Sequence, residues 1–305
     1  MNRRSLPVLL SLAFASAVAA QEAQPEAPPD PLKIYISADM EGVVGVVTGE
    51  QLGPEGFEYQ RFREFMTAEV NACIEAAREA GATEILVADA HGNGQNLLIE
   101  HLPEDVMVVR SWPRPLGMMA GIDGSFDGAI LLGYHASTAN ERGVRAHTFS
   151  SANVTGLRLN GTSMSEAGMS AAIAGHFGVP IIMVSGDHIA VAETQVIVGD
   201  VEGAVVKWAT GFHSARTLTP QAAYELIRDR TRAAIERIDQ FEPFVLERPV
   251  ELELSLKHYR PIELLDYLAD VERVSSHTIH YVGDDVVQVS NFLAFALSYR
   301  VDLQP

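Results

Sequence analysis

The sequence predicts an α/β fold in which a mostly parallel sheet is flanked by helices, with a smaller C-terminal α+β subdomain. The first observation is a set of short, unbroken apolar runs rich in β-branched residues, at 34–38, 85–88, 129–134 and 181–185. Such runs are typical of strands buried on both faces, as in parallel sheets. Helical patterns alternate with them, which indicates βαβ units. Each run also ends on residues of metal-binding type.

The elements of the first part follow from local patterns. After the strand at 34–38 and a glycine-containing loop, a helix is predicted from about Glu58 to Ala80, with Gly81 in the position that ends it. The strand at 129–134 follows the turn signal Phe126-Asp127-Gly128. The other elements predicted here are extended pieces at 106–109 and 156–159, a turn at Asn160-Gly161, and a helix at about 164–177.

The pattern changes beyond residue 218. An amphipathic helix is predicted from Thr219 to Phe241, with Thr219 as N-cap and Pro220 at its first position. Residues 250–256 alternate as a half-buried strand. The last predicted elements are a helix at about 261–269, a strand at about 272–282 and a helix at about 284–300. We therefore expect a metal-binding α/β domain at 33–200 and a C-terminal α/β subdomain at 201–305 packed on it.

Residues 1–20 have the composition of an export signal peptide. Arg3 and Arg4 precede an apolar stretch at 6–15, and small residues at 17–20 offer cleavage sites. The stretch is shorter than the roughly 20 residues that cross a bilayer. We expect an exported, periplasmic protein with no membrane contact after cleavage. Residues 21–32, with prolines at 25, 28, 29 and 31, are predicted to form a Pro-rich linker.

Charge and cysteine content narrow the possible partners and chemistry. Lysine and arginine number 22 against 40 aspartates and glutamates, which gives a net charge of −18. Nucleic acid and anionic membranes need a basic face, so neither is an expected partner. Cys73, the one cysteine, has no partner for an intramolecular disulfide. Its spacing matches the apolar face of the helix at 58–80, which predicts a buried core thiol rather than a nucleophile.

Candidate metal ligands lie where the predicted strands end, and the ligand crevice of an open parallel sheet lies beyond the carboxyl ends of its strands. Asp39 and Glu41 follow the strand at 34–38, and a continued pleat would point both carboxylates to one side. His91 follows the second run, where Asp89 could orient its imidazole, and His135 follows the third. Oxygen and nitrogen ligands suit zinc, singly or as a bridged pair, although cobalt and manganese are alternatives.

Two further residues have competing interpretations. Ser163-Met164-Ser165-Glu166 fits a capping box, which begins a helix without any metal and is the simpler interpretation of Glu166 on the residues alone. His147 is ambiguous by position alone. The same holds for Asp187, His176, His188 and His213.

Five segments occur in an order and spacing that resemble the D-aminopeptidase family of bacterial dipeptide-transport operons. They are Ser37–Gly42, Asp89–His91, Gly133–Ala136, Ala146–Thr148 and Ser165–Gly168. The resemblance covers about residues 33–301. It implies a binuclear zinc aminopeptidase that releases N-terminal D-amino acids, D-alanine foremost, from short peptides. It also implies a homo-oligomer, a ring-stacked decamer.

By position, the resemblance assigns the zinc ligands to Asp39, Glu41, His91, His135 and Glu166, with Asp39 as the bridging carboxylate. It assigns the catalytic role to His147, either as general base and acid or as a direct nucleophile. The chain departs from the family at its export signal. It departs again at His188, where the family carries an acidic residue.

Two alternative functions fit some of the same observations. A phosphoesterase could use the same metal ligands, but it needs basic groups for phosphate, and only Arg142 and Arg145 lie near the motifs. A non-catalytic periplasmic binding protein would explain the export signal and the α/β pattern. It would not explain metal-binding types of residue at several strand ends.

Overall fold

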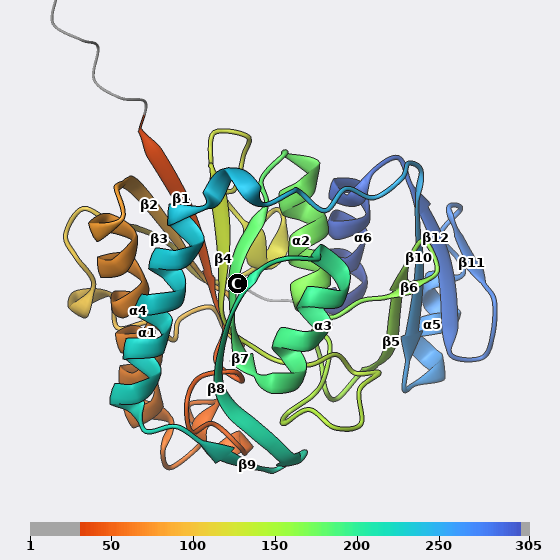
Figure 1. Cartoon of the computed structure of the whole chain (residues 1–305). Helices are drawn as coiled ribbons and strands as arrows, with labels where there is room; N and C mark the ends of the chain where they lie inside the picture. Colours follow the sequence, from red (N-terminus) through yellow and green to blue (C-terminus); the bar gives the residue numbers. More distant parts are fainter. Residues whose placement is uncertain (1–30, 300–305) are drawn as a thin grey trace, which may run out of the picture. The chain divides into compact units, whose positions relative to one another are not determined.

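The computed structural model describes residues 31–299, and Figure 1 shows the arrangement of their helices and strands. The predicted signal peptide and all but the last two residues of the predicted linker lie outside the described residues. Sheet A has seven strands in the order β3-β2-β1-β4-β7-β8-β9, all parallel except β9. Its strands are β1 Leu32–Ala38, β2 Ala82–Asp89, β3 Met107–Val109, β4 Gly128–Tyr134, β7 Ile181–Asp187, β8 Glu202–Gly211 and β9 Ser214–Thr217. The predicted fold class is confirmed.

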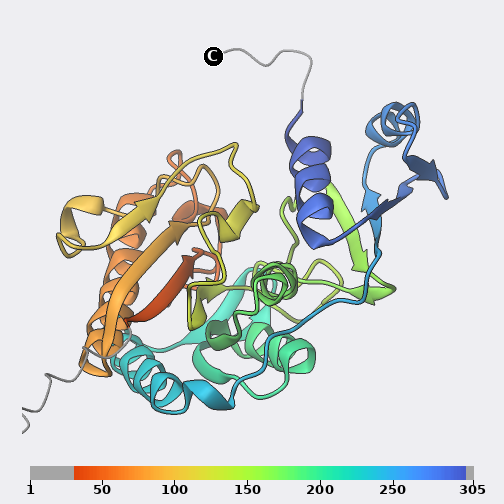
Figure 2. The same cartoon turned by 90° about the horizontal axis from the view of Figure 1, so that it is seen from above.

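Helices cover both faces of sheet A (Figures 1 and 2). α1 Tyr59–Glu79 and α4 Pro220–Glu236 lie side by side on one face, where they enclose an apolar core with Ile34 and Ile36 of β1. α2 Glu166–His176 and α3 His188–Val198 lie on the other face, toward which Tyr35 points. This alternation along β1 is the period of two that a strand buried on both faces requires. Cys73 is fully buried in α1, as predicted, and burial raises the pKa of its thiol to about 12.

Sheet B is antiparallel and has five strands in the order β11-β12-β10-β5-β6. They are β5 Val154–Leu159, β6 Thr162–Ser163, β10 Val250–Leu256, β11 Val271–Arg273 and β12 Thr278–Gly283. α5 Tyr259–Leu265 packs on this sheet, and α6 Val286–Ser298 contacts both sheet B and α2. One apolar core therefore continues from sheet A through α2 and α6 to sheet B. No helix within residues 31–299 has the length and apolar character needed to span a membrane.

The two sheets do not follow the sequence division at residue 200. β8 and β9, from beyond that point, complete sheet A, whereas the hairpin β5–β6 from the first part belongs to sheet B. α3, β8 and β9 were not predicted, because α3 begins directly where β7 ends and β8 lacks a regular polar alternation. The strand predicted at 272–282 is two strands, β11 and β12, which pair across a turn.

The loop after β1 packs against the end of β4 at backbone distance. The Gly42 amide donates to the Gly133 carbonyl at 2.6 Å. A Cβ on Gly42 would lie 2.1 Å from the Tyr134 carbonyl oxygen, and one on Gly133 would lie 2.2 Å from the Asp39 carbonyl oxygen. Gly133 also has a φ of +68°. Only glycine fits at both positions, so the course of the loop that begins at Asp39 is fixed by backbone contact.

We expect Gly42→Ala to lower the free energy of unfolding by about 3 kcal/mol, because the added methyl group meets backbone atoms that cannot rotate away. Gly53→Ala is the matched control, since nothing lies within 4 Å of a Cβ placed there. The control should stay within about 0.5 kcal/mol of the parent chain. Chemical denaturation measures both, and equal stability of the two variants would contradict the close approach.

Candidate metal centre

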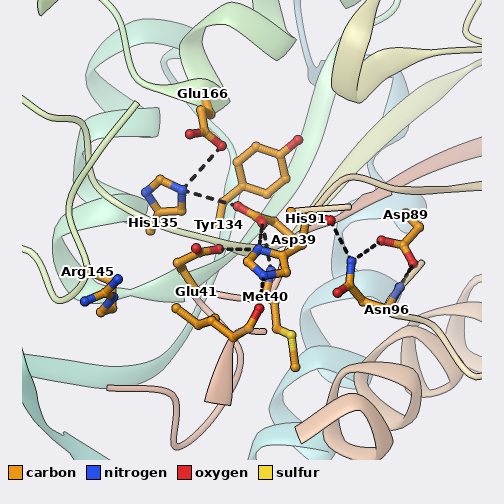
Figure 3. A network of polar contacts seen from close by, with 12 residues as sticks. Asp39, Met40, Glu41, Asp89, His91, Asn96, Tyr134, His135, Arg145 and Glu166 are labelled. Atoms are coloured by element: carbon orange, nitrogen blue, oxygen red, sulfur yellow. Dashed lines mark hydrogen bonds and ion pairs between the residues drawn. The ribbon is translucent and has the colours of Figure 1, made fainter. Parts of the chain in front are cut away.

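Three carboxylates and three imidazoles meet at the carboxyl edge of sheet A, and Figure 3 shows most of this cluster. The loop after β1 supplies two carboxylates, α2 supplies the third from its first residue, and the loops that follow β2 and β4 supply the imidazoles. The structure therefore brings together all six residues that the sequence predicted for the site. They are Asp39, Glu41, His91, His135, His147 and Glu166.

Each imidazole is held through one ring nitrogen by a backbone carbonyl. A carbonyl only accepts hydrogen bonds, so the nitrogen facing it carries the hydrogen, and the other nitrogen of a neutral ring presents a lone pair. This is the usual way in which proteins orient histidine ligands of metals. The pairs are His91 Nε2 with Leu52 O at 2.7 Å, His135 Nδ1 with Ala136 O at 3.0 Å, and His147 Nδ1 with Arg145 O at 2.8 Å.

The free ring nitrogens of His91 and His135 point at carboxylate oxygens. His91 Nδ1 lies 2.8 Å from Glu41 Oε2 and 3.3 Å from Asp39 Oδ1. His135 Nε2 lies 3.3 Å from Asp39 Oδ2 and 3.3 Å from Glu166 Oε2. Asp39 thus offers one oxygen to each imidazole and links two groups of donor atoms.

His147 lies slightly farther from the carboxylates. Its ring stacks on His135 with 4.1 Å between the ring centroids. Its Nε2 is 3.9 Å from Glu41 Oε1 and 3.8 Å from Glu166 Oε1. The free nitrogen of His147 therefore faces the same space as the donor atoms of the other five residues.

Burial and mutual charge shift the acid–base properties of this cluster. Burial, reinforced by the Glu41 carboxylate, raises the pKa of Asp39. Burial alone would raise the pKa of Glu41, but the neighbouring His91 holds it well below its ordinary value. Burial would lower the pKa of His135, but the carboxylates of Glu166 and Asp39 hold it well above that value. The cluster is electrostatically stable only with positive charge among its carboxylates.

The donor atoms fit a bound metal. Asp39 Oδ2, Glu41 Oε2 and His135 Nε2 are buried and form no hydrogen bond, although each lies within ion-pair distance of another group in the cluster. Buried polar atoms are normally paired, so three such atoms in one cluster fit the ligands of a bound cation. Carboxylate oxygens and imidazole nitrogens without sulfur are a donor set that zinc accepts.

Three local expectations were wrong in detail. Glu41 does not continue the pleat, since β1 ends at Ala38 and Glu41 lies in a turn closed by the Val43 amide and the Met40 carbonyl. Its carboxylate reaches the site because of that turn. Asp89 does not contact the His91 imidazole.

Asp89 instead orders the loop that follows His91. Its carboxylate accepts hydrogen bonds from the amides of Asn96 and Leu97 and from the Asn96 side chain. The Asn96 side chain also donates to the His91 carbonyl. The acidic residue therefore positions the His91 backbone rather than its ring.

The capping box expected at 163–166 does not form. The N-cap of α2 is Ser165, whose hydroxyl accepts from the Gly168 amide at 3.1 Å, and Ser163 belongs to β6. Glu166 is consequently the first helical residue. Its carboxylate accepts from the Phe149 amide and turns into the cluster, so helix initiation and site formation use different side chains.

The other ambiguous polar residues lie outside the cluster. Asp187 caps α3 by accepting from the amides of Ile189 and Ala190. His188 accepts from the Ala209 amide at 3.3 Å. His176 ends α2 and contacts Arg248, and His213 lies exposed between β8 and β9.

Two buried ionisable residues lie beside the site at positions that the sequence patterns did not predict. Lys207 of β8 is fully buried, and burial lowers the pKa of its ammonium group to about 8. Glu69 of α1 is also buried, which raises the pKa of its carboxyl group to about 7. A signal for Lys207 was present in the sequence, because it interrupts the apolar stretch 204–209, but no strand had been predicted there.

The cluster opens into a cavity of about 440 Å³. Asp39, Glu41 and Glu166 line this cavity together with apolar side chains of α2 and α6. The latter include Ile173, Leu293 and Leu297. Cavities of this size hold small organic ligands, so a substrate can reach the donor atoms beside an apolar wall.

Comparisons with known proteins agree with this geometry. A family model described as D-aminopeptidase, peptidase family M55, matches residues 32–295. A D-aminopeptidase from Bacillus subtilis strain 168 is 31% identical over 262 residues, which cover 84% of this chain and 93% of the relative.

A solved structure extends the similarity to three dimensions. It is the Zn-dependent D-aminopeptidase DppA from Bacillus subtilis, described as a self-compartmentalizing protease. It matches with a TM-score of 0.82 and 29% identity, over 88% of this chain and 100% of the other. With a family model that spans almost all of the described residues, the chain belongs to the M55 family of D-aminopeptidases.

Proposed function

We propose that this protein is a zinc-dependent aminopeptidase that removes N-terminal D-amino acids, D-alanine among them, from short peptides. The observation that carries the proposal is the set of three imidazoles, each anchored on a backbone carbonyl, that face three buried carboxylates. Such an arrangement suits a metal centre and would be costly in a site without a cation. Membership of the family and the zinc dependence described for the Bacillus subtilis structure support the choice of reaction and metal.

Two zinc ions per chain suit the division of the donor atoms. His91 and Glu41 would hold one ion, His135 and Glu166 the other, and Asp39 would bridge them with its two oxygens. When bound, zinc supplies Lewis-acid polarisation of the scissile carbonyl and lowers the pKa of water. Asp39 places one carboxylate oxygen near each group of donor atoms, as a ligand shared by both groups would.

His147 is suited to move a proton during hydrolysis. Its Nδ1–H is fixed on the Arg145 carbonyl, so Nε2 is free to accept a proton from the attacking water. The water oxygen adds to the carbonyl carbon, and the carbon–nitrogen bond then breaks. Nε2 returns the proton to the leaving amine, which balances the reaction. Stacking on His135 keeps the His147 ring in place for both transfers.

The cavity suits a short peptide rather than a phosphate ester. Its apolar wall on α2 and α6 accommodates small aliphatic side chains. Arg114 also lines the cavity, but its N–H groups donate to the carbonyls of Asp89, Val109 and Gly117. It is therefore engaged with the backbone and poorly placed to bind phosphate. Family membership likewise favours the peptidase over the phosphoesterase and the binding protein.

A substrate comparison tests the proposed activity. With zinc added, the chain should release D-alanine from D-Ala-D-Ala at least 100-fold faster than it hydrolyses L-Ala-L-Ala or a phosphomonoester, a preference of about 2.7 kcal/mol in transition-state stabilisation. Chromatography of the products measures the first two reactions, and phosphate release the third. Faster turnover of the phosphomonoester would favour the alternative function, and no turnover of any substrate would favour the binding protein.

Substitution should separate the catalytic histidine from the metal ligands. We expect His147→Ala to lower kcat by about 100-fold or more, the usual size of a proton-transfer contribution, while zinc stays near two per chain. Asp39→Ala should lose zinc and activity together, because it removes the oxygens shared by both donor groups. His258→Ala, at the exposed N-cap position before α5, is the control and should match the parent. The zinc content of each purified variant distinguishes the two roles. Loss of zinc from His147→Ala would show that His147 is a metal ligand.

We further propose that the mature protein is periplasmic and assembles into a homo-oligomer, with a decamer as the specific expectation. The related Bacillus subtilis structure is described as self-compartmentalizing. On α6 the side chain of Phe295 is exposed while Leu293 on the opposite side is buried, which leaves apolar surface for a subunit contact. Light scattering on protein recovered from the periplasmic fraction should give a mass several times that of one chain. A mass no greater than that of one chain, which is 33.1 kDa before cleavage, or recovery only from the cytoplasm would contradict one part of this proposal.

A further inference from the structure

The loop that carries Asp39 and Glu41 is held by a buried cation from a distant part of the chain. The Lys207 side chain, fully buried on β8, donates hydrogen bonds to three carbonyls of this loop. The acceptors are the carbonyl oxygens of Glu41, of Val43 at 2.9 Å and of Val46 at 2.8 Å. An ammonium group has three N–H donors, and all three are used here.

Two other side chains hold the amides of the same loop. The Val44 amide donates to Glu69 Oε1 at 2.9 Å, and the Gly45 amide donates to Thr217 Oγ1 at 3.0 Å. The carbonyls of the loop thus meet a cation from β8, while its amides meet acceptors from α1 and β9. Three separate elements hold one short turn, although a surface loop would normally satisfy such groups with water.

This contact has no role in substrate binding. The ammonium group has no N–H left to bind a ligand, and Lys207 is not among the residues that line the cavity. Removal of an ammonium group from water is costly, and full hydrogen bonding to the loop offsets that cost. The positive charge also lies near the carboxylates of Glu41 and Asp39, which it attracts.

We propose that Lys207 is a positioning residue that fixes the metal-binding loop before metal arrives, with Glu69 holding the amide side of the same loop. Because the carbonyl of Glu41 is one of its acceptors, Lys207 sets the backbone from which that carboxylate reaches the centre. The loop then does not have to be ordered by the metal, which increases the affinity of the site. The inference rests on the proposed function insofar as zinc is the metal bound.

Lys207→Met tests this role, since it keeps the length and apolar stem of the side chain but removes its three donors. We expect zinc affinity, measured by competition with a chelator, to fall about 10- to 100-fold, as for other groups that support metal ligands. In the metal-free protein, the amides of residues 42–46 should exchange hydrogen faster than in the parent chain. Lys207→Gln retains two N–H donors on a shorter side chain and should lie between the parent and Lys207→Met.

Leu254→Ala in the core of sheet B is the matched control, because it lowers stability without contact to the loop. It should bind zinc like the parent and leave exchange of residues 42–46 unchanged. The positioning role is wrong if folded Lys207→Met retains the zinc affinity of the parent and its hydrogen exchange at residues 42–46. If Lys207→Met does not fold, the same criterion applies to Lys207→Gln. The positioning role is equally wrong if Leu254→Ala weakens zinc to the same extent. A parent chain that binds no zinc would instead refute the proposed function, and the exchange measurement would still report on the loop.

Discussion

Confinement of three carboxylates and three imidazoles to one buried point is the constraint on which the rest of this structure depends. Ionised carboxylates repel one another, and burial amplifies that repulsion because water no longer screens it. In the neutral form that binds a metal, the imidazoles do not relieve it, since the carbonyls of Leu52, Ala136 and Arg145 turn a ring lone pair toward the cluster. A cation is the simplest group that satisfies these atoms together. The site is therefore suited to hold positive charge among its carboxylates, which a bound metal would supply while the imidazoles stay neutral.

The surrounding backbone is arranged so that this unfavourable cluster cannot relax apart. Gly42 and Gly133 allow the loop after β1 and the end of β4 to touch without side chains between them. Lys207 and Glu69 hold the next few residues from two other elements. The free energy that keeps the donor atoms together thus comes from packing and hydrogen bonds around the site, as expected for a preorganised centre.

The second sheet gives the centre its surroundings. α6 lies between sheet B and α2, and its apolar residues form a wall of the cavity into which the donor atoms open. Along the chain, the hairpin β5–β6 of sheet B lies between β4 and α2. The segment that carries His147 precedes this hairpin, and the helix that carries Glu166 follows it. The topology that builds the cavity therefore also brings these two residues to the centre.

The sequence by itself determined the parallel strands β1, β2, β4 and β7 of sheet A and the residues that follow them. A strand buried on both faces leaves a continuous apolar run, and its end is marked by the first polar residue. That was enough to predict that Asp39, His91 and His135 meet, since neighbouring parallel strands end at one edge. Glu166 and His147 came from the resemblance to a family, because a helix-initiating segment and a lone histidine carry no signal of their own. Only the tertiary structure decided the partners: which carbonyl turns each ring, that Asp89 holds a loop, and that Lys207 reaches a turn more than 160 residues earlier in the chain. Such contacts join segments whose local patterns are independent of one another, so no periodicity or spacing within either segment records them.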